Sequence, residues 1–278
     1  MKFTKMHGIG NDYVYVNCFE EQVENPAEMA VKVSKYHYGV GSDGLIMICP
    51  SEVADFEMKM YNADGSESEM CGNGTRCVGK YVYDRGLTDK TTVSLMTGAG
   101  LKVLQLNVRD GKVASVKVDM GAPELRPEMV PVDLPGEMVM GHRLQVGSQV
   151  YEIHCVSMGN PHCVVFVDSD IDNINLEEIG PLFENDPIFP ERVNTEFVTV
   201  LNEKTIKMRV WERGSGETWA CGTGACAVAV AACENGFCKK GDDIKIKLKG
   251  GDLIINYTDE TVYMTGNAEK VYEGEVEV

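Results

Sequence analysis

Apolar and polar residues alternate along many short stretches of this chain, and a few longer stretches have a helical apolar pattern. In the first part of the chain the pattern predicts strands at 12–18, 56–61, 92–97, 101–108 and 112–120. Further on it predicts strands at 162–168, 206–212, 243–249, 252–258 and 261–266. Helices are predicted at 26–38, 71–85, 176–185 and 221–235. Many strands with few helices indicate an α+β fold.

The order of these predicted elements occurs twice, and so do parts of the sequence. Residues 58–74, "MKMYNADGSESEMCGNG", align without a gap on residues 208–224, "MRVWERGSGETWACGTG". The alignment matches Glu67 with Glu217 and Cys71 with Cys221. Several ungapped matches at one offset predict a tandem duplication. The Pro- and Gly-containing segment 118–137 is the expected junction between the two halves.

Each half contains a Cys-Gly-Xaa-Gly stretch directly before a predicted helix. The glycines allow a tight turn, and the first N–H groups of a helix have no partner within the helix. A helix N-terminus carries a partial positive charge that favours an anion and a thiolate. We therefore expect each turn to bind a carboxylate, and we expect the pKa of Cys71 and Cys221 to be lowered from about 8.5.

Two such turns, facing each other across the junction, would place one sulfur on each side of an α-carbon. Inversion of that carbon by proton transfer needs a base on one face and an acid on the other, and two thiols can exchange these roles. General acid–base catalysis supplies about 10²–10⁴-fold, so orientation and an enclosed site must supply the rest. This scheme requires no cofactor. No Cys and His set has the short spacing of a zinc site, so no metal is expected.

The net charge argues against two classes of partner. The chain has 26 Lys and Arg against 43 Asp and Glu, a net charge of −17. Nucleic acids and anionic membranes need a basic face, so neither is expected as a main partner. The N-terminus does not resemble a signal peptide and no stretch approaches about 18 apolar residues, so a cytoplasmic location is expected.

The sequence resembles the diaminopimelate epimerase family. The resemblance is carried by "GIGNDY", "VGSDG", "YNADGSESEMCGNGTRC", "VDMGAP", "MGNPHCV", "RVNTEFV" and "WERGSGETWACGTGACA". It implies a pyridoxal-independent isomerase without a cofactor that converts LL-2,6-diaminopimelate to meso-diaminopimelate, in lysine and peptidoglycan-precursor biosynthesis. It also implies two pseudo-symmetric domains, each a β-barrel-like sheet around a central helix, with the active site in the cleft between them. The implied domains are 1–119 plus 267–278 and 120–266, and a homodimer is the default expectation.

The resemblance also implies roles for single residues. Cys71 and Cys221 match the two catalytic bases. The N–H groups that hold the reacting carboxylate are matched by Gly72, Asn73, Gly222 and Thr223. A carboxylate suits an ammonium group and a guanidinium can clamp a carboxylate, so Glu212 and Arg213 are expected to bind the distal end of the substrate. The amides expected to complete the substrate shell are Asn11, Asn62, Asn160 and Asn194.

Two positions are less certain from the sequence. His162 follows Asn160 and Pro161, so it is either a neighbour of the cleft or a core histidine. Some family members have Gln where this chain has Gly44, so any side-chain contact with the substrate at that position is absent here.

Three alternative functions stay open at this point. A proline or hydroxyproline racemase, or a phenazine-type isomerase, would share the fold but lack the combination of Glu212, Arg213 and the four asparagines. A thiol–disulfide redox protein could use Cys71 and Cys221, although catalytic dithiols usually have CxxC spacing. A nucleotide-binding protein could use the Gly-rich turns, although neither turn has the lysine of a P-loop.

Overall fold

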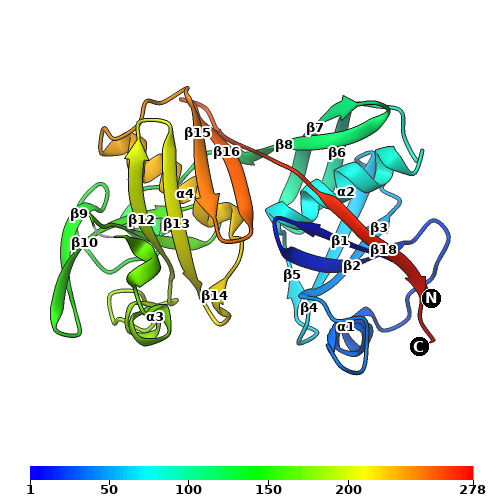
Figure 1. Cartoon of the computed structure of the whole chain (residues 1–278), viewed down its shortest axis with the longest axis horizontal. Coiled ribbons are helices and arrows are strands. Elements are labelled where there is room, and N and C mark those ends of the chain that lie inside the picture. Colours follow the sequence, from blue (N-terminus) through cyan, green and yellow to red (C-terminus); the bar gives the residue numbers. More distant parts are fainter. Residues whose placement is uncertain (169, 278) are drawn as a thin grey trace. The chain divides into compact units, whose positions relative to one another are not determined.

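The computed structural model describes residues 1–168 and 170–277, and the chain divides into two compact units (Figure 1). The first unit contains Met1–Asp119 and the described residues from Thr265 onward, and the second contains Met120–Met264. The short 3-10 helix η1 (Pro127–Met129) lies in the Pro- and Gly-containing segment expected as the junction. Among the described residues, no helix is long and apolar enough to cross a membrane.

The first unit is built on a mixed sheet. Its strands are β1 (Lys2–Gly8), β2 (Asn11–Asn17), β3 (Gly44–Cys49), β4 (Phe56–Asn62), β5 (Glu67–Ser68), β6 (Thr92–Thr97), β7 (Gly100–Arg109), β8 (Lys112–Gly121) and β18 (Glu269–Glu275). β1 pairs antiparallel with both β18 and β2, and β2 pairs parallel with β3. β3 pairs antiparallel with β4, which pairs parallel with β6. β6, β7 and β8 follow as an antiparallel meander.

The second unit has the same order of pairings. Its strands are β9 (Met140–Val146), β10 (Gln149–Ser157), β11 (Pro161–Phe166), β12 (Asn194–Asn202), β13 (Thr205–Glu212), β14 (Gly216–Thr218), β15 (Asp243–Leu248), β16 (Gly251–Tyr257) and β17 (Val262–Gly266). β11 pairs parallel with β12, β12 antiparallel with β13, and β13 parallel with β15. β9, β10 and β11 are antiparallel neighbours, as are β15 and β16. The predicted duplication and the α+β class are confirmed.

A long helix lies against the strands of each unit. α2 (Gly72–Asp84) contacts β1, β2 and β7, and α4 (Gly222–Glu234) contacts β10, β11, β12, β15 and β16 (Figure 1). Residues 225–232 of α4 are fully buried on every side. A helix that is apolar all round must be covered all round, so the sequence correctly indicates a central helix wrapped by strands.

The two other α-helices cover one face of each sheet. α1 (Pro26–Ser34) packs on β3 and β4, and α3 (Leu176–Glu184) packs on β12, β13 and β14. The prediction of helix 26–38 is too long. Tyr36 and Tyr38 extend the apolar pattern, yet they are 75% and 91% exposed. The chain reverses after Ser34, where the N–H groups of Val40 and Gly41 bond to the carbonyl of Val33.

Several strands have no alternating pattern, and the sequence analysis misses them. β3, "GLIMIC", is buried at every residue because helix α1 covers one face and the unit's interior the other. A strand covered on both faces needs no polar side chains, so the alternation disappears. β18 is missed for the opposite reason, since nearly all its residues are exposed and its pairing with β1 holds it in place.

Candidate active site

Cys71 and Cys221 occupy the same structural position in the two units. Each is the N-cap of a central helix and has an extended backbone conformation. In each case the Sγ atom accepts a hydrogen bond from the N–H of the second glycine of the turn, Gly74 or Gly224, at 3.4 Å. The antiparallel pairs β4–β5 and β13–β14 deliver the chain to these turns.

In the first unit, the predicted site residue Asn11 lies directly beside Cys71. The Cys71 thiol is 3.1 Å from Asn11 Oδ1, to which the Nδ2 group of Asn73 also donates at 3.2 Å. Asn11 Nδ2 in turn donates to Asp43 Oδ2 at 2.7 Å. Asn11 at the start of β2 is therefore held from both sides and fixes the environment of the Cys71 sulfur.

Asn73, another predicted site residue, is held from inside helix α2. The guanidinium of Arg76 is fully buried and donates to Asn73 Oδ1 at 2.9 Å. Arg76 Nε also donates to the carbonyl of Asn267 at 3.2 Å, just before β18. The first turn of α2 is thus connected to the C-terminal segment by one buried cation.

Two other positions that the sequence analysis discussed, Asn62 and Gly44, lie at the ends of strands β4 and β3 in this unit. Asn62 ends β4 and donates from Nδ2 to Ser66 Oγ at 3.0 Å, so it closes the turn between β4 and β5. Gly44 begins β3, where an added Cβ would overlap the carbonyl of Tyr61 and lie 3.0 Å from the Tyr13 ring. No side chain fits at Gly44 in this backbone, and Tyr13 lies beside the position.

In the second unit, Cys221 is surrounded by acidic and hydroxyl groups. Its Sγ lies 3.6 Å from Thr223 Oγ1. Glu212, at the end of β13, accepts a hydrogen bond from the Thr218 hydroxyl. Removal from water raises the pKa of Glu212, and the nearby Glu196 adds to this increase. The predicted site residues Glu212, Cys221 and Thr223 are thus brought together.

His162 and Glu196 form a buried pair next to Cys221. The His162 Nδ1 atom lies 2.7 Å from Glu196 Oε1, and both side chains are fully buried. His162 Nε2 lies 3.0 Å from Oδ1 of Asn160, a predicted substrate residue. One polar side-chain atom from each of His162, Glu196 and Cys221 lies within 4.8 Å of the others, so the three residues form one buried cluster.

The environment of Cys221 corrects one expectation from the sequence. The pKa of this thiol is raised well above its ordinary value, mainly by burial and then by the negative charges of Glu212 and Glu196. The hydrogen bonds from Thr223 and the Gly224 N–H act in the opposite direction but are weaker. A helix N-terminus lowers a thiol pKa, but here two buried carboxylates and the loss of water outweigh it.

Asn194 and Arg213 are linked by a hydrogen bond between the Asn194 side chain and the Arg213 backbone. Asn194 is buried at the start of β12, where its Nδ2 donates to the Pro161 carbonyl at 2.8 Å. Its Oδ1 accepts from the backbone N–H of Arg213 at 2.9 Å. The Arg213 guanidinium donates to the Glu191 carbonyl at 2.8 Å. Asn194 therefore positions the turn that carries Arg213.

Three residues near the cysteines were missed by the sequence analysis. Glu196 was not selected, although a charged residue inside the apolar strand "NTEFVTV" is a usable signal. Asp43, in the quoted stretch "VGSDG", holds Asn11. Tyr13 is buried near Cys71, and burial followed by the charge of Cys71 raises its phenol pKa well above the ordinary value.

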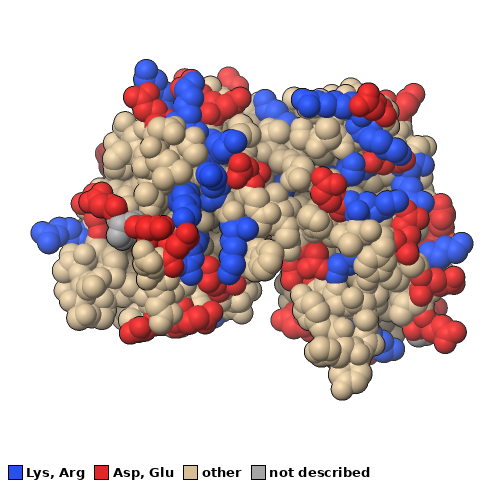
Figure 2. All heavy atoms as spheres, in the orientation of Figure 1, with Lys and Arg blue, Asp and Glu red and all other residues tan. Residues whose placement is uncertain are grey.

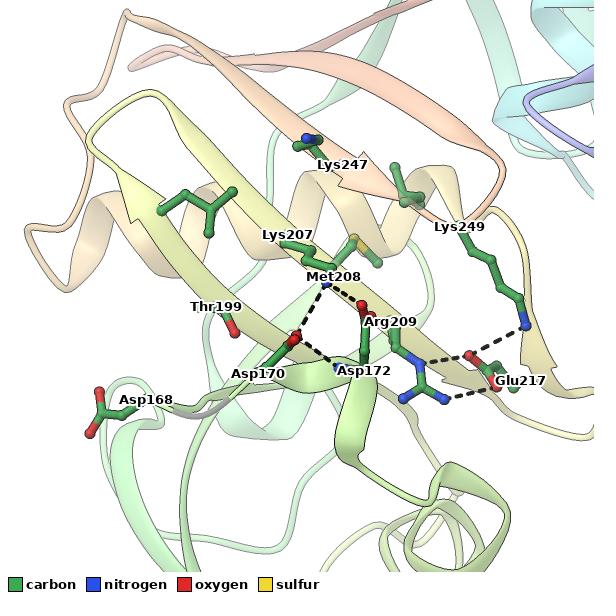
Figure 3. A pocket seen from close by; sticks show the side chains of 12 residues that line it. Asp168, Asp170, Asp172, Thr199, Lys207, Met208, Arg209, Glu217, Lys247 and Lys249 are labelled. Carbon is green, nitrogen blue, oxygen red and sulfur yellow. Dashed lines mark hydrogen bonds and ion pairs between the residues drawn. The ribbon is translucent and has the colours of Figure 1, made fainter.

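A surface hollow lined by charged side chains of the second unit lies elsewhere. Figure 3 shows that two of its basic side chains face acidic ones: Lys207 meets Asp172 at 2.6 Å, and Arg209 meets Glu217 at 2.8 Å. Among the described residues that line it, there is no predicted site residue. Basic and acidic side chains are also interspersed over the face drawn in Figure 2. We therefore place the candidate site at the cysteine turns.

A family model and several curated relatives that match this chain all carry the same description. A family model described as diaminopimelate epimerase matches residues 3–126 and 154–271. The chain is 57% identical over 280 residues to a diaminopimelate epimerase of Acetivibrio thermocellus, covering 100% of this chain and 99% of that protein. It is 56% identical to one from Agathobacter rectalis and 52% identical to one from Methanococcus maripaludis, each with 100% of both chains covered.

Solved structures with low sequence identity share the fold. A probable proline racemase from Agrobacterium radiobacter superposes with a TM-score of 0.74 at 15% identity, covering 100% of this chain and 93% of that chain. A phenazine biosynthesis protein of the PhzF family from Bacillus anthracis gives 0.73 at 19% identity, covering 100% and 99%. At these identities the likeness establishes the architecture alone.

Proposed function

The chain belongs to the diaminopimelate epimerase family, and from this premise we propose that it interconverts LL- and meso-2,6-diaminopimelate by two-base proton transfer. The observation that carries the proposal is the repeated cysteine turn. Cys71 and Cys221 cap equivalent helices and lie among polar side chains that the sequence had already singled out. Two thiols at the starts of two helices supply both a base and an acid for one carbon that bears a carboxylate.

The proton balance of the proposed reaction is simple. One cysteine, as thiolate, removes the α-proton, and the other, as thiol, delivers a proton to the opposite face. Each turnover exchanges the protonation states of the two sulfurs. Burial and two neighbouring carboxylates favour the thiol form of Cys221. We therefore propose that, in the resting enzyme, Cys71 is the thiolate that removes the α-proton and Cys221 is the thiol that donates a proton.

We propose that the helix starts hold the reacting carboxylate. Backbone N–H groups at Gly72 and Asn73, and at Gly222 and Thr223, lie in the first turns of α2 and α4. Such donors stabilise the negative charge that develops as the α-proton leaves. Arg213, fixed by Asn194 and Glu191, would clamp the distal carboxylate, and Glu212 would receive the distal ammonium group.

The cellular role follows the same proposal. The substrate is a small molecule, and we propose a cytoplasmic enzyme of lysine and peptidoglycan-precursor biosynthesis that acts as a homodimer. A proline-type racemase is the main alternative within this fold. Its substrate has one carboxylate and would leave Arg213 without an anionic partner.

The decisive experiment follows α-proton exchange in deuterated water with LL-diaminopimelate and no added pyridoxal phosphate. We expect the wild-type chain to form meso product carrying deuterium at the inverted carbon. Cys71→Ser and Cys221→Ser should each lose epimerisation by at least about 10²-fold, because each removes one partner of the proton transfer. Cys77→Ser, a buried cysteine in α2, is the matched control and should retain activity.

Two outcomes would contradict the proposal. Retention of full activity by either active-site variant would remove that cysteine from the chemistry. Racemisation of proline at a higher kcat/KM than diaminopimelate would place the chain in the alternative class.

A further inference from the structure

Glu196 is a buried charged side chain that the proposed chemistry does not yet use. It lies in β12 and is fully buried. Its Oε1 atom is 2.7 Å from His162 Nδ1, whereas its Oε2 atom has no hydrogen-bond partner among the residues that the structure describes. A buried carboxylate with an unsatisfied oxygen costs stability, so packing alone does not account for a glutamate at this position.

The carboxylate of Glu196 lies against the turn that holds Cys221. A Cβ atom added at Gly224 would come within 2.5 Å of Glu196 Oε1 and within 3.2 Å of Cys221 Sγ. A ligand atom of Glu196 also lies within 4.8 Å of both the sulfur and the His162 ring. Because Gly224 has no side chain, the Glu196 carboxylate and the Cys221 sulfur can both lie against its Cα.

Comparison of the two repeats shows that only one of the two cysteine turns has a carboxylate at this position. At the offset of the alignment, Glu196 corresponds to Ile46, and both lie next to the second glycine of the turn in their own unit. An added Cβ at Gly74 would meet Ile46 Cδ1 at 2.6 Å. The same position beside the cysteine helix is therefore apolar in the first unit and anionic in the second.

The partner strand shows a matching difference. Ile46 pairs with Tyr15 between β2 and β3, and Glu196 pairs with Val164 between β11 and β12. Two residues earlier on these partner strands are Tyr13 and His162. The first unit thus has a buried phenol where the second has an imidazole bonded to a carboxylate.

We infer that Glu196 is a positioning residue that fixes the His162 imidazole beside Cys221 and holds the Cys221 sulfur as a neutral thiol between turnovers. A thiolate would add a negative charge beside the carboxylates of Glu212 and Glu196 in a poorly hydrated interior, so both oppose ionisation of the sulfur. Of the two, Glu196 is the one that also contacts His162 Nδ1. The contact between His162 Nδ1 and Glu196 Oε1 sets the orientation of the ring, and therefore of Nε2 toward Asn160. This inference rests on the proposed function and deepens it, because it names the residue that keeps the resting proton on Cys221.

The test compares the two cysteines within one molecule. Both are alkylated with iodoacetamide between pH 6 and 10, and modification is quantified for each cysteine peptide by mass spectrometry. In Glu196→Gln, which keeps the shape and removes the charge, we expect Cys221 to be modified about tenfold faster at neutral pH, which corresponds to a fall of about one unit in the pKa of its thiol. The profile of Cys71 should not move.

The control variant is Glu184→Gln. Glu184 is another buried carboxylate of the second unit, bonded to Trp211 Nε1 at 2.7 Å. Its substitution should leave the Cys221 profile unchanged, so a shift in both variants would reveal a general loosening of the unit. An unchanged Cys221 profile in Glu196→Gln, or an equal shift of both cysteines, would overturn the inference.

Glu196→Asp provides a second test if the Gln variant does not fold. The shorter carboxylate keeps the charge but moves it away from His162, so we expect the Cys221 profile to stay near wild type while kcat falls at least tenfold with little change in KM. Unchanged kcat would overturn the positioning role. The alkylation experiment needs no substrate, so its failure is distinguishable from a failure of wild-type diaminopimelate turnover.

Discussion

At the scale of single residues, Gly74 and Gly224 show how one duplicated position acquires two environments. Both donate an N–H group to the N-cap sulfur. An added Cβ meets a flexible methyl group of Ile46 at the first glycine and a buried carboxylate oxygen of Glu196 at the second. The Ile46 methyl can rotate away, whereas Glu196 is held by His162.

We therefore expect Gly224→Ala to destabilise the chain by about 1–3 kcal/mol and to lower turnover, because overpacking displaces the carboxylate or the sulfur. Gly74→Ala, the matched variant, should cost less in stability. Urea unfolding followed by circular dichroism measures both. An equal loss of stability in the two variants would contradict the difference between the two turns.

At the scale of elements, the two central helices differ in how they are anchored. α4 is buried through apolar contacts along 225–232. α2 instead buries a guanidinium, Arg76, which bonds to side-chain and backbone oxygens. The residue at the equivalent position of α4 is Cys226, which is also fully buried.

Arg76→Met is expected to destabilise the chain by about 2–5 kcal/mol. The change leaves Asn73 Oδ1 and the Asn267 carbonyl without the donor they now have, and hydrogen bonds to charged groups are worth about 1.5–3 kcal/mol each. Cys226→Ala, the equivalent change in α4, should cost about 1 kcal/mol, since it removes one small buried group. Thermal unfolding of both variants measures the difference, and a Cys226→Ala loss as large as that of Arg76→Met would refute it.

At the scale of the whole molecule, the first unit is completed by the end of the chain. β18 pairs with β1 from Lys2 to His7. The Phe3 ring packs edge-on against Tyr272 with centroids 5.9 Å apart, and the backbone of Gly274 passes close to the same ring. Residues at opposite ends of the sequence thus share one sheet edge.

Deletion of residues 267–278 should therefore weaken the first unit selectively. We expect amide protection in β1 and α2 to fall at least tenfold in hydrogen exchange, because β1 loses its antiparallel partner and Arg76 loses the Asn267 carbonyl. Both tryptophans, Trp211 and Trp219, lie in the second unit, so unchanged tryptophan fluorescence is the control that this unit stays folded. Loss of protection throughout α4 to the same extent would contradict this assignment.

The sequence predicted the elements whose pattern depends on local burial. Alternation is visible in β4, β6 and β15 because one face is buried and the other is not. Alternation is absent from β3, which is covered on both faces. The helical apolar pattern was misleading at Tyr36 and Tyr38, which continue it past the end of α1 but are exposed to solvent. Burial on both faces and exposure of aromatic residues are tertiary properties that a local pattern does not contain.

By itself, the sequence determined the tandem repeat, the α+β class, the family and the place of each cysteine at a helix start, because these depend on spacing along the chain. Only the tertiary structure decided which groups surround those cysteines. Glu212 and Glu196 approach Cys221 from two different strands, and burial of the sulfur together with their charges reverses the pKa shift expected from the helix start alone. Distance in space sets electrostatic interactions, and folding creates that proximity between residues far apart in the sequence.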